Sequence, residues 1–465
     1  MGDAPLETDP AALIRSRRYR VLLVLAAIIG LIVSTASWCF LEAVHEVEIW
    51  VYDDLPHHAG YHTAPVWWPL PWLALAGALT AFAVRRLPGN GGHVPSDGLK
   101  AGGHPTRPID LPGVLLAALA TLGLGLVLGP EGPLIALGLG LGTLSMRLVK
   151  RDAPEQVLGL MAAAGSFAAV ASIFGSPVIG AVLVIEAAGL GGATLPLVLL
   201  PGLLAAGIGS LVFIGLGSFS GFSTAAWALS PFPLPPFGGP GWSDFAWTIV
   251  VSVVAAVGVF GVMEVARWSK RVVDTRPFVL TIAAGLAVGG LAIAYAESTG
   301  KPFSDVLFSG EESFGSLFSS AATISMSTLV LLLLFKSLAW SISLGNFRGG
   351  PTFPAIFLGV VAGLMAQHLP GFAETQAVTA LVGALCVSVL RLPLSSVMIA
   401  TLLASNAGLA VAPLIVVAVT VAYLTSESLT AFVDARIGAE PSRDGRLHRW
   451  RRGRDVPEAP AAVPK

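Results

Sequence analysis

The sequence predicts an all-α, polytopic membrane protein, and its composition is the main reason. Of its 465 residues, 54% are hydrophobic and only 12% are charged, whereas soluble domains carry about 25% charged residues. Too few charges remain to cover a surface that faces water. The 53 glycines and 33 prolines show no collagen-like period. In so apolar a chain they are typical of broken or closely packed membrane helices.

The same composition excludes several classes of protein. A net charge of −1 lacks the basic excess of a nucleic-acid binder, so no nucleic acid is expected as a partner. The apolar content excludes a disordered chain and an ordinary soluble enzyme. Cys39 and Cys386 both lie in apolar runs and indicate neither a disulfide framework nor a metal site. We therefore expect the lipid bilayer as a partner, and no cofactor or metal.

The charges near the N-terminus predict the orientation of the chain. Residues 1–20 end in four arginines, directly ahead of an apolar run over residues 21–40 that is long enough to cross a bilayer once. Residues 41–65 carry five carboxylates and four histidines but no lysine or arginine, and are expected to form an external loop. A second apolar run over residues 66–84 ends in two arginines. The positive-inside rule then places both termini in the cytoplasm, which requires an even number of crossings.

The rest of the chain is predicted to form two membrane halves. The first half spans residues 21–220, a Pro/Gly-rich linker spans 221–241, the second half spans 242–436, and a basic cytoplasmic tail spans 437–465. Several apolar segments are too short to span a bilayer alone and are cut by Gly and Pro, so we expect broken helices that line a cavity. The amphipathic segment 300–318 is expected to connect two helices outside the membrane.

An internal repeat relates the two predicted halves. Gly129–Gly140 and Gly350–Gly363 both place a Gly/Pro break directly before an apolar helix. Each is followed by a second element that contains a proline, Gly165–Ile185 in the first half and Gly383–Leu403 in the second. This order indicates a duplicated transporter whose site lies where the broken helices meet.

Glu131 is the candidate functional residue at the first break. It is the only charged residue between Leu111 and Ser145. Helix N-termini attract anions through unpaired N–H groups and the helix dipole, so a carboxylate here can occupy an anion site and leave it when protonated. Glu131 could instead be a simple helix cap. A lone carboxylate inside a membrane is costly, however, which favours the functional interpretation.

Two other classes of function fit the sequence less well. A membrane-embedded hydrolase needs a Ser/His pair, paired aspartates or a His-rich metal motif, and the eight histidines lie mostly in loops or at segment ends. A cation or amino-acid transporter would need clustered carboxylates, whereas Glu131 and Glu186 are far apart in the sequence. Anion transport is the preferred hypothesis, without enzymatic activity.

These features resemble the CLC family of chloride channels and chloride/proton exchangers. The resemblance covers most of residues 21–436 and implies an inverted repeat of two halves with broken, tilted helices. It also implies a chloride pathway, a location in the cell membrane and a homodimer. The matching segments, in family order, are Leu116–Gly140 with Glu131 in the gating motif G-R/K-E-G-P, Gly165–Glu186, Lys336–Gly363 with the G-G-x-F-x-P region, and the R-x-P match Arg391–Pro393.

The resemblance implies roles for further residues. Glu131 takes the gating position, and Glu186 is interpreted as a structural carboxylate. Lys336 and Arg391 are expected to neutralise buried carbonyls or helix ends, and His93 is expected to have no role. The implied anion-binding positions are Gly92, Gly132, Thr352, Phe353 and Thr430, and the implied structural prolines are Pro133 and Pro354.

Several positions depart from the family pattern. Pro130 replaces the basic residue of the gating motif, Gly92 stands where the family has an anion-coordinating serine, and Thr430 stands where it has a tyrosine. Ala187 occupies the position of the exchangers' inner proton-relay glutamate. These departures predict weak or absent proton coupling. The sequence leaves open whether the protein is a channel or an exchanger, and whether it selects chloride, nitrate, bromide or fluoride.

Overall fold

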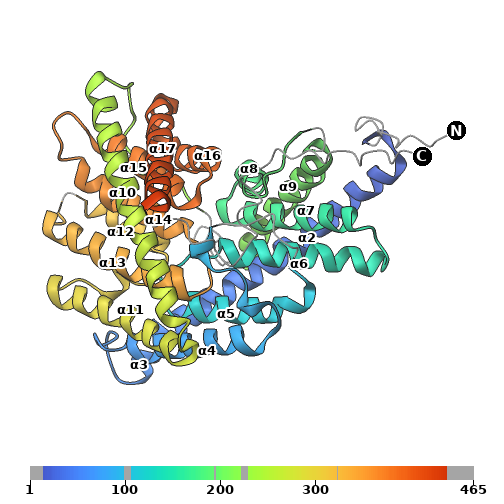
Figure 1. Ribbon diagram of the computed structural model, residues 1–465, viewed down its shortest axis with the longest axis horizontal. Coiled ribbons are helices and arrows are strands. Elements are labelled where there is room, and N and C mark those ends of the chain that lie inside the picture. Colours follow the sequence, from blue (N-terminus) through green and yellow to red (C-terminus); the bar gives the residue numbers. More distant parts are fainter. Residues whose placement is uncertain (1–13, 99–105, 193–194, 221–228, 322, 437–465) are drawn as a thin grey trace, which may run out of the picture.

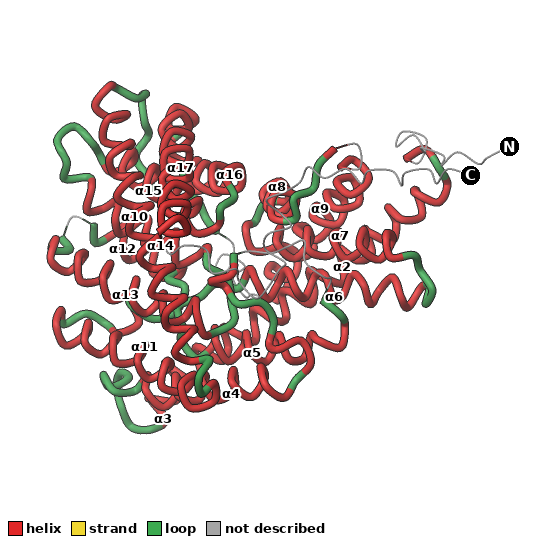
Figure 2. Tube along the Cα trace, in the orientation of Figure 1, coloured by secondary structure: helices red, strands yellow, loops and turns green. Residues whose placement is uncertain are grey.

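The computed structural model describes residues 14–98, 106–192, 195–220, 229–321 and 323–436. This part of the chain is helical, with no strand apart from one isolated bridge (Figure 2). Eight of its helices are long and apolar enough to cross a membrane. The predicted all-α polytopic membrane fold is therefore confirmed. Residues 1–13 of the predicted N-terminal segment 1–20, and the whole predicted tail 437–465, lie outside the described residues.

The first half contains seven main helices, shown in blue to green in Figure 1. The first of them continues through a π-helical turn (Trp50–Asp54) into the short helix α3 (Leu55–His58). The helices are α2 (Arg17–Ile49), α4 (Pro69–Arg86), α5 (Leu111–Gly123), α6 (Glu131–Val149), α7 (Glu155–Phe174), α8 (Pro177–Ala187) and α9 (Leu195–Ser220).

The second half follows the same order, shown in yellow-green to red in Figure 1. A short helix, α12 (Phe314–Ser319), is the one addition within the described part of this half. The main helices are α10 (Trp242–Val273), α11 (Pro277–Thr299), α13 (Met326–Asn346), α14 (Thr352–Ala366), α15 (Glu374–Leu390), α16 (Pro393–Leu403) and α17 (Ala412–Arg436).

The predicted repeat is visible in matching helix breaks. Helices α7 and α15 both end with a residue in the left-handed conformation, Gly175 (φ 60°) and Arg391 (φ 59°). In both halves a proline opens the next helix two residues later, at Pro177 and Pro393. Helix α6 packs on α7 as α14 packs on α15, so the two halves repeat one arrangement of broken helices.

The two halves are joined at the breaks before α6 and α14. The N–H of Gly129 donates to the carbonyl oxygen of Gly350 (2.8 Å), and the N–H of Gly350 donates back to that of Gly129 (2.6 Å). Equivalent residues of the repeat thus form an antiparallel bridge. A reciprocal pair between equivalent residues implies a local two-fold axis, as expected for inverted repeats.

The linker between the halves is partly described. Its residues 221–228 lie outside the described part, and the remainder runs without regular secondary structure along both halves. The N–H of Leu229 donates to Ile173 in the first half (3.3 Å), and that of Phe232 donates to Leu403 in the second (2.8 Å). Both side chains are buried.

The prediction of a loop over residues 41–65 is wrong for most of that range. Helical structure continues from α2 to His58, and we call residues 41–58 the α2 extension. Leu41, Val44 and Val51 are buried on this extension, while carboxylates occupy other positions around it. Its apolar residues recur at helical spacing, so the segment is an amphipathic helix whose polar residues mimic a loop composition.

Segment 300–318 also differs from a simple external connection, because part of it is packed inside. Leu307 is buried, and the N–H of Phe308 donates to the carbonyl of Gly125 (3.2 Å). The Nζ of Lys336 donates to the carbonyls of Asp305, Val306 and Leu307 at 2.9, 3.3 and 2.9 Å. The expectation that Lys336 neutralises buried carbonyls is confirmed.

Candidate anion site

The candidate site lies where the N-termini of α6 and α14 meet. Glu131 is the first residue of α6, and Thr352 is the first residue of α14. The side chain of Glu131 is fully buried, and its Oε1 accepts a hydrogen bond from the backbone N–H of Thr352. The carboxylate of one half therefore occupies the helix N-terminus of the other, which is a favourable position for an anion.

The hydrogen bonding of Glu131 is incomplete. Its second oxygen, Oε2, is buried without a hydrogen-bond partner, and so is the nearby Oγ1 of Thr352. An unsatisfied buried acceptor costs about 1–3 kcal/mol, and more when it is charged. A proton on Oε2 would remove the charge from this unpartnered oxygen, and movement of the side chain out of the site would remove the cost.

Two glycines make room for the carboxylate. A Cβ atom added at Gly350 would lie 1.9 Å from Cδ of Glu131, and one added at Gly129 would lie 2.2 Å from Oε2. No larger residue fits at either position while Glu131 stays in place. The repeated glycines of the two breaks therefore define the shape of the site.

Two predicted site residues, Gly132 and Phe353, lie next to Glu131 and Thr352 at these helix starts. A Cβ atom added at Gly132 would lie 2.6 Å from the carbonyl oxygen of Gly349, so Gly132 packs against the opposite break. Phe353 is fully buried, and its ring stacks on that of Phe174 with centroids 6.0 Å apart. The end of α7 thus also contributes to this centre.

Pro133 and Pro354 are the third residues of α6 and α14, and both are buried. Backbone N–H groups in the first turn of a helix have no partner within the helix. A proline there removes a donor that would otherwise need one. Their equivalent positions explain how both breaks can start a helix inside an apolar region.

The other two predicted anion-binding residues, Gly92 and Thr430, lie away from Glu131. Gly92 follows α4 in a loop with φ of 93° and has no side-chain donor. Thr430 is on α17, where its Oγ1 accepts from Nη2 of Arg391 (3.1 Å) and donates to the carbonyl of Ser426 (2.9 Å). Within the described residues, no hydrogen bond joins either of them to Glu131.

A large cavity of about 840 Å³ has both Gly92 and Gly132 in its wall. His93 also lines it, and its ring bonds to the carbonyl of Gly98. The charged residues in the described part of the wall are two arginines, Arg107 and Arg147, and two carboxylates, Asp110 and Glu155, and Arg107 is paired with Asp110 (3.1 Å). This cavity thus extends from the loop after α4 to the residue that directly follows Glu131.

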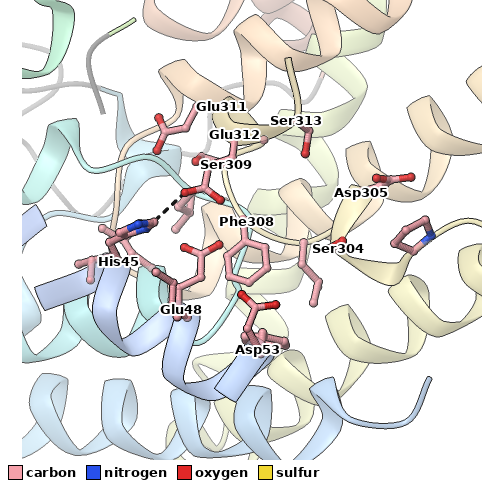
Figure 3. A pocket seen from close by; sticks show the side chains of 18 of the residues that line it. His45, Glu48, Asp53, Ser304, Asp305, Phe308, Ser309, Glu311, Glu312 and Ser313 are labelled. Atoms are coloured by element: carbon pink, nitrogen blue, oxygen red, sulfur yellow. Dashed lines mark ion pairs between the residues drawn. The ribbon is translucent and has the colours of Figure 1, made fainter. Parts of the chain in front are cut away.

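A second cavity, of about 420 Å³, is acidic. Pro130, the residue before Glu131, is part of its wall, and no lysine or arginine is among its described lining residues. Figure 3 shows carboxylates from the α2 extension and from segment 300–318 around this space, with His45 paired to Glu312 (3.3 Å). The acidic lining residues are Glu48, Asp53, Asp305, Glu311 and Glu312.

Glu311 is the most perturbed acid of this cavity outside the predicted spans. Burial raises the pKa of its carboxyl well above the usual range, and the neighbouring charges of Glu48, Glu312 and Glu131 raise it further. The folded protein therefore holds a proton on Glu311 at pH values where the unfolded chain has lost it.

This shift predicts a pH-dependent stability. Between the ordinary pKa of 4.5 and the raised folded-state value, the folded state binds more protons, so stability falls as pH rises. Glu311→Gln should therefore raise the melting temperature at pH 7.5, and the gain should vanish below pH 4.5. The measurement is thermal unfolding in detergent across this range. Glu264→Gln, at a half-exposed ion pair on α10, is the control, and an equal gain in both variants would contradict the assignment.

Glu186 caps the helix α16 of the other half. Its carboxylate accepts from the N–H of Leu394 (2.9 Å) and from the N–H and Oγ of Ser395 (2.7 and 2.6 Å). These contacts support the structural interpretation of Glu186. They also occupy both of its oxygens, so it is poorly placed to serve another site.

Removing this cap should destabilise the protein. Glu186→Ala leaves N–H groups at the start of α16 without an acceptor, and loss of a helix cap costs about 0.5–2 kcal/mol. We expect a lower melting temperature in detergent, with a smaller loss for Glu186→Gln, which keeps one acceptor. An unchanged melting temperature in Glu186→Ala would show that water replaces the cap.

Arg348 is a buried cation that the sequence analysis did not single out. It directly precedes Gly349 and Gly350 and is only 8% exposed. The sequence does contain a feature that could have indicated this residue. Arg348 is the only charged residue between Lys336 and Glu374, which is the same kind of isolation that drew attention to Glu131.

In this structure two buried helix N-termini meet at a carboxylate, inside a duplicated bundle of membrane helices. This combination indicates the class of anion channels and transporters. The sequence pattern of the family described as "Voltage gated chloride channel" matches residues 76–427. This chain belongs to that family, the CLC family, and the predicted resemblance is confirmed.

Similar proteins agree with this assignment. The "Putative ion-transport protein YfeO" of Escherichia coli (strain 55989 / EAEC) is 27% identical over 362 residues, or 77% of this chain and 81% of the relative. A solved slow cyanobacterial Cl⁻/H⁺ antiporter has a similar fold, with a TM-score of 0.71 and 21% identity over 90% of this chain and 98% of its own. A CLC-type fluoride/proton antiporter gives a TM-score of 0.66 and 18% identity over 88% and 96%.

Proposed function

We propose that this protein carries small monovalent anions, chloride first, across the membrane along a pathway gated by Glu131. The single observation that carries the proposal is the buried bond from the N–H of Thr352 to the carboxylate of Glu131. A carboxylate at a helix N-terminus stands where a free anion would bind. When it leaves, the same N–H groups are available to chloride.

The two cavities support a pathway through this point. The acidic cavity reaches Pro130 and the larger cavity reaches Gly132, so they approach the residues on either side of Glu131. We infer that movement of the Glu131 side chain connects them. Gly132, Thr352, Phe353 and, through the larger cavity, Gly92 are the proposed anion contacts. Thr430 is a weaker candidate because Arg391 engages its hydroxyl.

We further propose that proton coupling is weak or absent. Ala187 has no titratable atom, and both oxygens of the adjacent Glu186 are engaged in the cap of α16. A proton relay through an apolar interior needs groups that accept and release protons readily. The alternative is a proton-coupled exchanger, favoured by the antiporters of similar fold. Fluoride or nitrate remain alternative substrates.

One experiment separates these functions. Protein reconstituted in liposomes with a chloride gradient should release chloride without moving internal pH, and substitution by fluoride, nitrate or bromide ranks selectivity. Uphill proton movement at a fixed anion-to-proton ratio would establish the exchanger instead. Empty liposomes and the variant Glu131→Gln are the controls.

The proposal also covers the oligomeric state of the protein and its orientation in the membrane. We propose a homodimer in the cell membrane with both termini in the cytoplasm and one complete pathway in each subunit. The two halves of one chain already supply both helix N-termini of the site, so a second subunit is not needed to complete it.

A further inference from the structure

The acidic cavity carries more negative charge than the described residues neutralise. Two of its five carboxylates, Glu48 and Asp53, lie on the α2 extension, and the other three lie on segment 300–318 (Figure 3). No basic side chain of the described residues lies within ion-pair distance of Glu48, Asp53 or Glu311. Negative charge gathered in a partly enclosed space is costly unless protons or a positively charged ligand compensate it.

Glu311 indicates where a hydrogen-bond donor is missing. Its Oε2 is buried and has no hydrogen-bond partner. Burial raises the pKa of this carboxyl well above its usual range, and the charges of Glu48, Glu312 and Glu131 raise it further. A positively charged N–H group is the strongest partner for such an acceptor. The other titratable groups in the wall of the cavity are His45, Asp53 and Asp305.

The carboxylates are spread too widely for a metal ion. Within the part of the chain that the structure describes, no group of three His, Cys, Asp or Glu side chains could hold one. The cavity measures about 420 Å³, and small-molecule sites range from about 300 to 1,000 Å³. The carboxylates and the volume therefore fit an elongated molecule with more than one positive charge.

The surface between the acidic groups is apolar. Leu122, Leu128 and Leu307 are buried and belong to the wall of the cavity. The rings of Tyr52 and Phe308 are part of the same wall and meet edge to face with centroids 5.1 Å apart. An aliphatic chain can lie against the leucines, and aromatic rings attract ammonium groups.

We infer that the acidic cavity is a binding site for a linear aliphatic diamine or polyamine. One ammonium group binds Oε2 of Glu311, the chain lies on the apolar surface, and a second ammonium group binds the carboxylates of the α2 extension. A quaternary ammonium has no N–H group for Glu311, and a monoamine leaves the carboxylates at the other end uncompensated. Asp53 and Ser304 are exposed, so the ligand can enter from solvent. This inference goes beyond the proposed function, because its ligand is a cation.

Calorimetric titration of the purified protein in detergent at pH 7.5 tests the site, with 1,4-diaminobutane and spermidine as probes. Both should bind saturably, and butylamine, which has one ammonium group, should bind at least about tenfold more weakly. Glu311→Gln and Glu48→Gln should each weaken binding of the diamine about tenfold, as expected for loss of a charge-assisted hydrogen bond. Glu264→Gln, at a half-exposed ion pair on α10, is the matched control and should bind as wild type.

Proton release gives a second measurement at Glu311. A bound ammonium group stabilises the ionised carboxylate, so the wild-type protein should release a proton to the buffer when the diamine binds. The heat of binding should therefore differ between HEPES and Tris, and this difference should shrink in Glu311→Gln. An unchanged difference in Glu311→Gln would place the ligand away from this carboxyl and overturn the site.

Three further outcomes would overturn the inference: no binding of either probe at millimolar concentration, equal affinity for butylamine and the diamine, or displacement of the diamine by an equal concentration of Mg²⁺. If Glu311→Gln fails to fold, Glu48→Gln decides, and wild-type affinity in that variant would overturn the site. Binding is measured without an ion gradient. Absence of chloride flux in liposomes would therefore count against the proposed function alone.

Discussion

Glu131→Gln should raise chloride flux several-fold at neutral pH and remove most of its pH dependence. The amide has nearly the shape of the carboxylate but carries no charge to compete with an anion at the N-terminus of α14. It also accepts a weaker hydrogen bond from the N–H of Thr352, because charge-assisted bonds are the stronger ones. At acidic pH the wild-type protein should show a similar rise in chloride flux, because protonation of the unpartnered Oε2 removes the charge of Glu131.

Chloride efflux from liposomes at pH 4.5 and pH 7.5 checks this prediction. Glu186→Gln makes the same chemical change at the carboxylate that caps α16, and it should leave the pH dependence of flux intact. If Glu131→Gln and wild type gave identical flux at both pH values, Glu131 would not be the gate.

Gly350→Ala should have a comparably large effect by a different route. Its new Cβ would lie 1.9 Å from Cδ of Glu131, far inside van der Waals contact, so the carboxylate must leave its site. We expect flux to shift in the direction of Glu131→Gln and the melting temperature to fall, because an overpacked interior costs about 1–3 kcal/mol.

A double mutant isolates the cause of this effect. In a Glu131→Ala background the clash disappears, so Gly350→Ala should change flux little. Residues in direct contact give such non-additive results. Gly359→Ala is a suitable control, since Gly359 is also closely packed, against Val382 on α15, but lies away from the carboxylate. Equal effects of Gly350→Ala in both backgrounds would refute displacement of Glu131.

Much of the fold could be predicted because the bilayer restricts the choice. Apolar length and Gly/Pro breaks were enough to indicate helices, two halves and the paired breaks at Pro130 and Pro351. The α2 extension was missed because it carries five carboxylates, of which Glu48 and Asp53 line an acidic cavity. A polar wall inside a protein has the same composition as an external loop, and only the fold tells them apart.

The candidate site was predictable to a similar degree. Glu131 was evident because a lone carboxylate in an apolar run is costly to bury and is rarely kept without a function, and the repeat pointed to the break at Thr352. Arg348 is isolated in the sequence in the same way, but its burial could not be predicted, since it depends on the loop at Asn90, 258 positions away along the chain. Likewise, the position of Thr430 beside Arg391 depends on how α17 packs, which residue spacing does not reveal.

The reciprocal bond between Gly129 and Gly350 has a mechanical consequence. It joins the two halves directly beside Glu131, the proposed gate. Breaking both of its hydrogen bonds would leave four buried backbone groups without partners, at about 1–3 kcal/mol each, whereas moving the Glu131 side chain breaks only the bond that it accepts from Thr352. Movement of the side chain therefore requires less free energy than separation of the two halves. For the proposed pathway we thus expect opening by movement of the Glu131 side chain over a fixed backbone, with the surrounding helices keeping their places.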